Sequence, residues 1–183
     1  MTKPKTTTWE IEPHTKAKHE ILRRYLGAWF GIMMNSNPKI LFVDGFCGPG
    51  RYIKGEEGSP LIALNIAKEQ LIKCPQREVV LLFIDQDQDR IEFLKREIDK
   101  QDVPSNIHIN YVHNDFENSV SNILDGLQKA GQSLLPSFVF IDPFGFNDFP
   151  FAIVEKLLKN QRTEVFINVM VDFINRFLSD PNE

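Results

Sequence analysis

Acidic residues stand where four apolar segments of the sequence end, and carboxylates at such places can hold a ligand through hydrogen bonds. Asp44 ends the segment ILFVD and precedes a turn rich in glycine, GFCGPG. Asp85 ends EVVLLFID, Asp115 follows IHINYVHN, and Asp142 follows SFVFI. If these segments are parallel strands of one sheet, their carboxyl ends form the edge at which open α/β sheets bind ligands. The pattern therefore predicts one ligand site at that edge.

The glycine turn, residues 45–50, is of the wrong kind for a phosphate. A dinucleotide-binding turn has the pattern GxGxxG, but Gly48 and Gly50 are followed by Arg51, Tyr52 and Ile53, so the third glycine is missing. No GxxxxGK[ST] occurs, which excludes a P-loop NTPase. S-adenosylmethionine has no phosphate, and a glycine turn can pass close to its methionine part. We therefore expect S-adenosylmethionine as the cofactor.

Each part of this cofactor has an expected partner. Asp85 accepts hydrogen bonds from both ribose hydroxyls, Asp115 accepts one from the adenine amino group, and Phe116 lies against the adenine ring. The expected cofactor-binding residues are Asp44, Gly45, Phe46, Gly48, Gly50, Asp85, Asp115 and Phe116. The competing interpretation is structural, because a single Asp at such a place is more often a helix N-cap or a turn residue. Asp87 is expected to be such a cap.

The elements that would position these residues alternate along the chain. Strands are expected at residues 39–44, 78–85, 107–112, 137–141 and 164–169, and helices at 14–34, from Ser59 (as N-cap) to Cys74, after Asp87, before Gly131 and at 150–159. Strands apolar on both faces that alternate with amphipathic helices are typical of a parallel sheet covered on both sides. We predict an α/β fold with a Rossmann-like, methyltransferase-type doubly wound parallel sheet.

The ends of the chain complete this prediction. Residues 1–38 are expected to form an N-terminal helical extension, and residues 39–183 the α/β domain, which is expected to be truncated. Residues 170–183 leave room for one helix, Val171 to Leu178. The sheet is therefore predicted to lack its C-terminal closing strands.

Composition narrows the class of protein. The 183 residues are 42% hydrophobic, which suffices for the core of one domain, and no apolar run reaches bilayer length. Two cysteines and no CxxC pair indicate a reduced, cytoplasmic protein without a structural zinc site. The net charge of −4 gives no overall attraction to nucleic acid. The first 24 residues are locally basic, which a solvated helix face explains as well as a phosphate contact does.

The chain resembles the S-adenosylmethionine-dependent methyltransferase superfamily, and more closely the three-Cys-motif partner (TcmP) proteins of bacteria and archaea. The resemblance spans nearly the whole chain and lies in His14-Thr15, Lys18, Tyr25 to Trp29, VDGFCGPGRY, Gly58-Ser59-Pro60-Leu61, FIDPFG, Pro150-Phe151, Ile167-Asn168 and Asn175-Arg176. It implies a methyltransferase-like fold and association with a three-Cys-motif protein. The biochemical role of the family is not well defined.

The sequence after the fourth strand, Asp142-Pro143-Phe144-Gly145, suggests a catalytic position. Enzymes that methylate amino groups of DNA carry [DNS]PP[YFW] here, where the polar side chain holds the amino group and the aromatic ring stacks on a flipped base. We predict Asp142, Pro143 and Phe144 as the catalytic residues, with the aromatic position shifted by one. The alternative is a strand-to-loop turn whose phenylalanines lie in the core.

Some neighbouring residues are assigned smaller roles. His14 and His19 have the wrong spacing for a metal pair, and no metal site is expected. Cys47 is interpreted as a small filler of the glycine turn, since no adjacent His suggests an activated thiol. Residues 50–59 are an extra loop that could form a lid, in which Arg51 and Tyr52 either reach a substrate phosphate or merely cover the loop.

Three hypotheses stay open at this point. The first is an S-adenosylmethionine-dependent methyltransferase with a nucleic-acid substrate. The second is a non-catalytic protein of methyltransferase fold that docks a three-Cys-motif protein. The third is a nicotinamide-dinucleotide-binding domain, which the missing third glycine disfavours.

Overall fold

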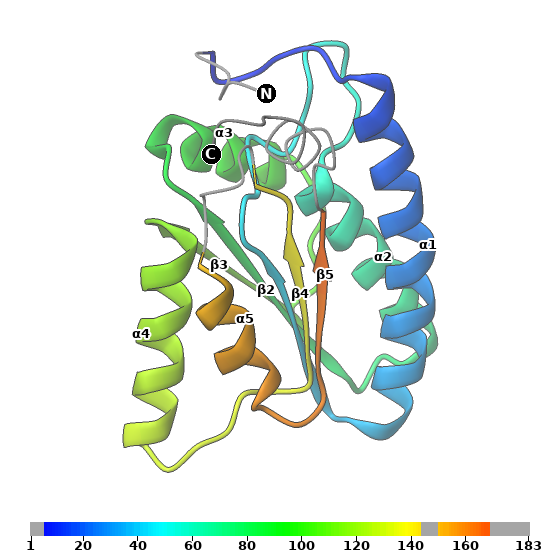
Figure 1. Ribbon diagram of the computed structural model, residues 1–183. Coiled ribbons are helices and arrows are strands. Elements are labelled where there is room, and N and C mark those ends of the chain that lie inside the picture. The colour runs from blue at the N-terminus through cyan, green and yellow to red at the C-terminus, as the bar shows by residue number, and fades with distance from the viewer. Residues whose placement is uncertain (1–5, 144–149, 169–183) are drawn as a thin grey trace, which may run out of the picture.

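The protein folds as alternating strands and helices (Figure 1), in a computed structural model that describes residues 6–143 and 150–168. The strands are β1 (Lys39–Asp44), β2 (Glu78–Asp85), β3 (Ile107–His113), β4 (Ser137–Ile141) and β5 (Thr163–Ile167). The helices are α1 (Pro13–Ser36), α2 (Ser59–Lys73), α3 (Gln88–Asp99), α4 (Phe116–Lys129) and α5 (Phe151–Leu158). The elements expected within these residues are all present.

The sheet is parallel and has the strand order β3-β2-β1-β4-β5. From β1 the chain first moves outward through β2 to β3, and then returns to the other side of β1 to place β4 and β5. The order therefore reverses between β1 and β4, and a crevice forms outside the carboxyl ends of the strands at such a reversal. The predicted Rossmann-like, doubly wound sheet is confirmed.

Helices cover both faces of the sheet. The buried residues of α1, α2 and α3 share one apolar cluster with one face, and those of α4 and α5 share a second cluster with the other. In Figure 1, α4 and α5 lie on the opposite side of the sheet from α1 and α2. Because each strand packs against helices on two sides, β1 and β4 are buried along almost their whole length.

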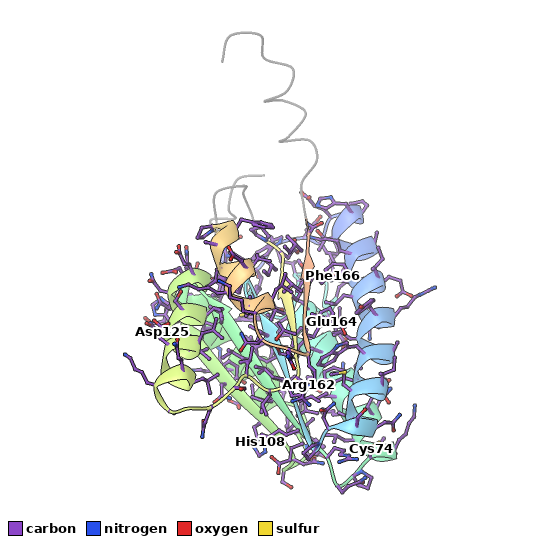
Figure 2. The ribbon with its side chains drawn as sticks, turned by 60° about the horizontal axis from the view of Figure 1, so that its bottom comes forward. Cys74, His108, Asp125, Arg162, Glu164 and Phe166 are labelled. Carbon is purple, nitrogen blue, oxygen red and sulfur yellow. The ribbon has the colours of Figure 1, made fainter. Side chains whose placement is uncertain are left out.

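Helix α1 is an integral part of one helical layer. Leu22, Leu26 and Phe30 are fully buried in the same cluster as α2. Figure 2 shows Glu164 on β5, whose carboxylate accepts hydrogen bonds from Tyr25 Oη at 2.7 Å and Trp29 Nε1 at 3.0 Å. The residues predicted as an N-terminal extension therefore include a helix that packs within the α/β core.

Helix ends follow the sequence signals with one correction. Asp87 caps α3 as predicted, since its side chain accepts from the backbone N–H groups of Asp89 and Arg90. Gly131, with φ of 65°, follows α4 in the left-handed conformation that glycine favours. The N-cap of α2 is Gly58, and the prediction of Ser59 was wrong. A Cβ on Gly58 would lie 3.1 Å from the backbone of Gly50, so the close approach of two loop segments sets this helix start.

Some expectations concern residues outside 6–143 and 150–168, which the structure does not describe. They are the roles of Phe144 and Phe146, the helix at Val171 to Leu178, and the predicted lack of closing strands after it. Within the described residues, none of the helices combines the length and the apolar character that crossing a membrane requires.

Candidate functional site

A cavity of about 290 Å³ lies at the carboxyl ends of β1 and β4, where the strand order reverses. Its walls come from residues 9–19, the glycine turn, the loop that leads to α2, and the end of β4. Phe46, Gly48 and Gly50 line it from one side and Asp142 and Pro143 from another. The volume is at the lower end of the range for ligand pockets, which begins at about 300 Å³.

Asp142 is held at both carboxylate oxygens. Lys18 of α1 donates from Nζ to Oδ2 at 2.5 Å, and Asn168, after β5, donates from Nδ2 to Oδ1 at 2.8 Å. The Lys18 and Asp142 side chains are 16% and 17% exposed, so their ion pair is largely removed from water. We call Lys18, Asp142 and Asn168 the Asp142 cluster. It presents a carboxylate of fixed orientation to the cavity.

Two buried ionisable groups belong to this region: His19 lines the cavity, and Asp44 lies outside its lining. Burial is the main reason that the pKa of Asp44 is raised to about 7, Ser59 and the Phe46 backbone oppose this rise, and the charges of Asp142 and Asp85 add smaller increases. Phe46 N donates to Oδ1 at 3.3 Å, whereas the Ser59 hydroxyl is near Asp44 without forming a hydrogen bond of regular geometry. Burial, followed by the charge of Lys18, lowers the pKa of His19 to about 4, so this imidazole is neutral at pH 7.

The three glycines of the turn, Gly45, Gly48 and Gly50, have different surroundings, and these explain why each position is glycine. A Cβ on Gly45 would lie 2.5 Å from the ring of Phe116, and one on Gly50 would lie 2.4 Å from Leu94. Packing therefore requires glycine at both positions. Gly48 has a φ of 60° and faces the indole of Trp9, 3.6 Å from where a Cβ would lie. Of the three glycines, Gly48 is therefore the best candidate for a contact with a ligand.

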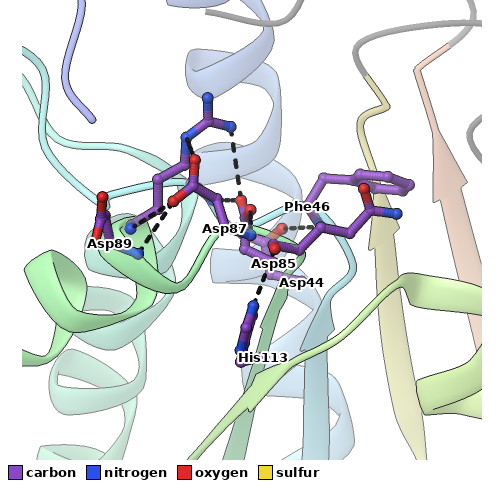
Figure 3. Close-up of polar contacts among 9 residues, drawn as sticks. Asp44, Phe46, Asp85, Asp87, Asp89 and His113 are labelled. Atoms are coloured by element: carbon purple, nitrogen blue, oxygen red, sulfur yellow. Dashed lines mark hydrogen bonds and ion pairs between the residues drawn. The ribbon is translucent and has the colours of Figure 1, made fainter. Parts of the chain in front are cut away.

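Asp85 lies outside the cavity lining, and its carboxylate is engaged by the protein itself (Figure 3). Its Oδ2 accepts from Gly48 N at 3.0 Å and its Oδ1 from Asp87 N at 2.8 Å. The guanidinium of Arg90, which is fully buried, lies 4.0 Å from Oδ2. Asp85 therefore fixes the glycine turn to the end of β2, and its predicted contact with a ribose stays a prediction.

Asp115 and Phe116 also have structural partners outside the cavity. Asp115 is the N-cap of α4, with Oδ1 accepting from Asn118 N and Oδ2 from Asn118 Nδ2, both at 2.7 Å. Burial raises the pKa of Asp115, but these hydrogen bonds outweigh it and hold the pKa below its usual value. Phe116 is 1% exposed and packs against Gly45 and Phe46. Neither ring face of Phe116 is open to an adenine in this arrangement, so these two roles also stay predictions.

The basic residues of the first helix are paired with acids. Lys16 binds Glu56, Arg23 binds Glu57, Arg24 binds Glu20, and Lys18 belongs to the Asp142 cluster. The described part of this region therefore presents paired cations, as expected for a helix face that packs against acidic neighbours. Arg51 likewise pairs with Glu97 at 2.8 Å, which favours its covering role.

The cavity brings together one part of the predicted set and adds residues that we missed. Phe46, Gly48, Gly50, Asp142 and Pro143 meet there, whereas Asp44, Gly45, Asp85, Asp115 and Phe116 do not line it. The residues that we missed are Trp9, Lys18 and His19, which line the cavity, and Asn168, which binds Asp142; Tyr52, named above for the loop of residues 50–59, lines it as well. Lys18 and Asn168 were within the segments of the family resemblance, which was the available signal. Trp9 and His19 had none.

Two sequence predictions concern the Cys47 thiol and the expectation that no metal is bound. Burial, followed by the charge of Asp44, raises the pKa of Cys47, so its thiol is protonated and fits the filler role. In the described ranges, no three His, Cys, Asp or Glu side chains are grouped so that they could hold a metal ion.

No family model matches the chain, and no curated protein matches it either. Among solved structures, it is similar to a protein from Haemophilus influenzae described as a "putative methylase". The two are 19% identical, and the match covers 80% of this chain and 74% of that chain, with a TM-score of 0.44. A likeness this distant says nothing about activity, and the fold assignment rests on the strand order itself.

Proposed function

We propose that the protein is an S-adenosylmethionine-dependent methyltransferase that acts on an amino group. The observation that supports this most is the Asp142 cluster, because it fixes a carboxylate beside the glycine turn, in a cavity at the reversal of strand order. Each oxygen of Asp142 already accepts one hydrogen bond, so the lone pairs that remain point in fixed directions and can accept from an amino group.

The charge at this edge suits a cationic cofactor better than an anionic one. Asp85 and Asp142 lie at strand ends, and the cations near them, Arg90 and Lys18, already face these carboxylates. The pyrophosphate of a nicotinamide dinucleotide would bring further negative charge next to these acids, whereas the sulfonium and amino groups of S-adenosylmethionine are positive. Gly48 and Phe46, which line the cavity, would hold the methionine part of the cofactor.

When bound, S-adenosylmethionine supplies a methyl group on a positively charged sulfur that an amine lone pair can attack. Asp142 would accept a hydrogen bond from the substrate amino group and turn its lone pair toward the methyl group. Lys18 and Asn168 act as positioning residues, since they hold the carboxylate in place. The attacking nitrogen would gain a positive charge, which the carboxylate of Asp142 would stabilise, and would then release one proton to water.

A nucleic-acid amine is our proposal for the substrate, and a three-Cys-motif protein is our proposal for a partner. The first depends on Asp142-Pro143 at the end of β4, and the second on the sequence resemblance. The described cations of α1 are paired with acids, so phosphate contacts would have to come from other residues.

Two measurements test the proposal. Calorimetry with S-adenosylmethionine and with NAD should show binding of the first alone, and NAD binding without S-adenosylmethionine binding would overturn it. With tritiated S-adenosylmethionine and a mixture of RNA and DNA, Asp142→Ala should lower methyl transfer by about 100-fold, because it removes the group that would orient the substrate amine. Lys18→Met should lower transfer more than Lys18→Arg, which can still form the ion pair. Equal loss in both Lys18 variants would contradict the positioning role.

A non-catalytic docking protein is the second candidate, and one observation favours it. The carboxylates of Asp85 and Asp115 are engaged by the protein's own N–H groups, as in a fold that no longer binds a nucleoside. This candidate predicts no binding of S-adenosylmethionine at millimolar concentration.

A further inference from the structure

The segment of residues 6–12, which we call the N-terminal strap, is attached to the loop that follows the glycine turn. Ile53 N donates to the carbonyl of Trp9 at 3.1 Å, and Lys54 pairs with Glu10 at 3.2 Å. The ring of Trp9 meets that of Tyr52 at a right angle, with centroids 5.8 Å apart. The strap is therefore held by a few contacts with one neighbouring loop.

The indole of Trp9 lies over the end of β2. It faces Gly48 at 3.6 Å from where a Cβ would be, and its ring is 4.9 Å from the guanidinium carbon of Arg90. Arg90 in turn lies 4.0 Å from the carboxylate of Asp85, which accepts the N–H of Gly48. Trp9 thus lies next to two of the residues near the Asp85 carboxylate, Gly48 and Arg90, and Asp85 is only 5% exposed.

A nucleoside whose ribose binds Asp85 must pass next to Gly48, and the indole stands in that place. We propose that Trp9 is a plug over the nucleoside half of the site, and that a nucleoside-containing cofactor binds there only when the strap moves away. The inference rests on the proposed function, since it takes Asp85 as the ribose partner.

The contacts that hold the plug are of the kinds that are individually weak. They include one edge-on aromatic pair, one cation–π contact, one backbone hydrogen bond and one ion pair between exposed side chains. Opening is therefore accessible to thermal motion, and the apparent dissociation constant is the intrinsic one divided by the open fraction. Removing the indole raises this fraction and should tighten binding.

The test is titration of the full chain with S-adenosylhomocysteine, by calorimetry and by tryptophan fluorescence. Trp9→Ala should bind at least about tenfold more tightly than the wild type, and Trp9→Phe should be intermediate. In the wild type, binding should change the fluorescence. Because Trp29 is the other tryptophan, this change should disappear in Trp9→Phe. Trp29→Phe is the matched control, since this indole is 4% exposed within the core and its loss should leave affinity unchanged.

Each outcome decides between distinct explanations. Binding by Trp9→Ala but not by the wild type would support a tightly closed plug. Weaker binding by Trp9→Ala would overturn the plug and make Trp9 a wall that contacts the cofactor. Equal affinity and equal association rates in both proteins would overturn it as well. If no variant binds S-adenosylhomocysteine, the proposed function itself fails, and the plug fails with it.

Discussion

The carboxyl edge of the sheet has two halves that contain the same kinds of residue and differ in what those residues contact. In the open half, at the ends of β1 and β4, the Asp142 cluster and the glycine turn border a cavity. In the filled half, at the ends of β2 and β3, Asp85 and Asp115 accept hydrogen bonds from the protein's own backbone. A carboxylate at a strand end is therefore a ligand candidate where it borders a cavity, as Asp142 does although both of its oxygens accept hydrogen bonds from Lys18 and Asn168.

The glycine turn connects the two halves. Its Gly48 N–H points to Asp85 in the filled half, while Phe46 and Gly48 line the cavity of the open half. Substitutions of acids outside the cavity lining, such as Asp44, Asp85 and Asp115, should therefore change stability, and those of the Asp142 cluster should change ligand binding.

The largest expected effect compares Asp44 with Asp85. The pKa of Asp44 is about 7 in the folded chain and near 3.8 when unfolded, so its contribution to stability is complete below pH 4 and is lost as the pH rises to 7. Asp44→Asn has no such loss. Its free energy of unfolding should exceed that of the wild type by roughly 4 kcal/mol at pH 8 and differ little from it at pH 4. Asp85→Asn should be less stable by about 1–3 kcal/mol, because it gives up an acceptor for a backbone N–H.

Urea unfolding of the three proteins at pH 4 and pH 8 measures this difference. A loss of stability in Asp44→Asn at pH 8 would show that the ionised Asp44 is well accommodated, and the contrast between the two acids would disappear.

A smaller effect concerns the packing beneath the filled half. Gly45→Ala places a methyl group 2.5 Å from the Phe116 ring and should lower the free energy of unfolding by about 1–3 kcal/mol. Gly126→Ala, inside α4 with no atom within 4 Å of the new methyl group, should raise it by about 0.5–1 kcal/mol. Denaturant unfolding of both variants checks this. If both stabilise the protein, Phe116 is free to move, and its ring becomes available to a ligand.

The smallest expected effect distinguishes two roles of Asp115, the N-cap of α4 and a ligand of adenine. Asp115→Ala removes the N-cap of α4 and should cost about 1 kcal/mol in unfolding free energy, without any change in the affinity for S-adenosylmethionine. Thermal unfolding and calorimetry measure the two quantities. A fall in affinity with unchanged stability would instead restore the adenine contact predicted from the sequence.

Most of the fold was predictable because its signals are local. The strands are continuous apolar runs, and the caps at Asp87 and Asp115 use side chains that bond to nearby residues in the chain. The start of α2 was misplaced by one residue because it depends on the contact of Gly58 with Gly50. This contact joins two segments of one loop that are eight residues apart. The candidate site was predicted in part, since Phe46, Gly48 and Asp142 follow strands directly.

The sequence by itself determined the alternation of strands and helices and the row of acids at the strand ends, because periodicity and turn residues act over a few positions. The tertiary structure decided which of these acids borders a cavity. Lys18 reaches Asp142 across 124 positions, and Trp9 reaches Arg90 from a different segment of the chain. Such contacts depend on how helices pack on the sheet, and the pairing and desolvation of each carboxylate follow from that packing.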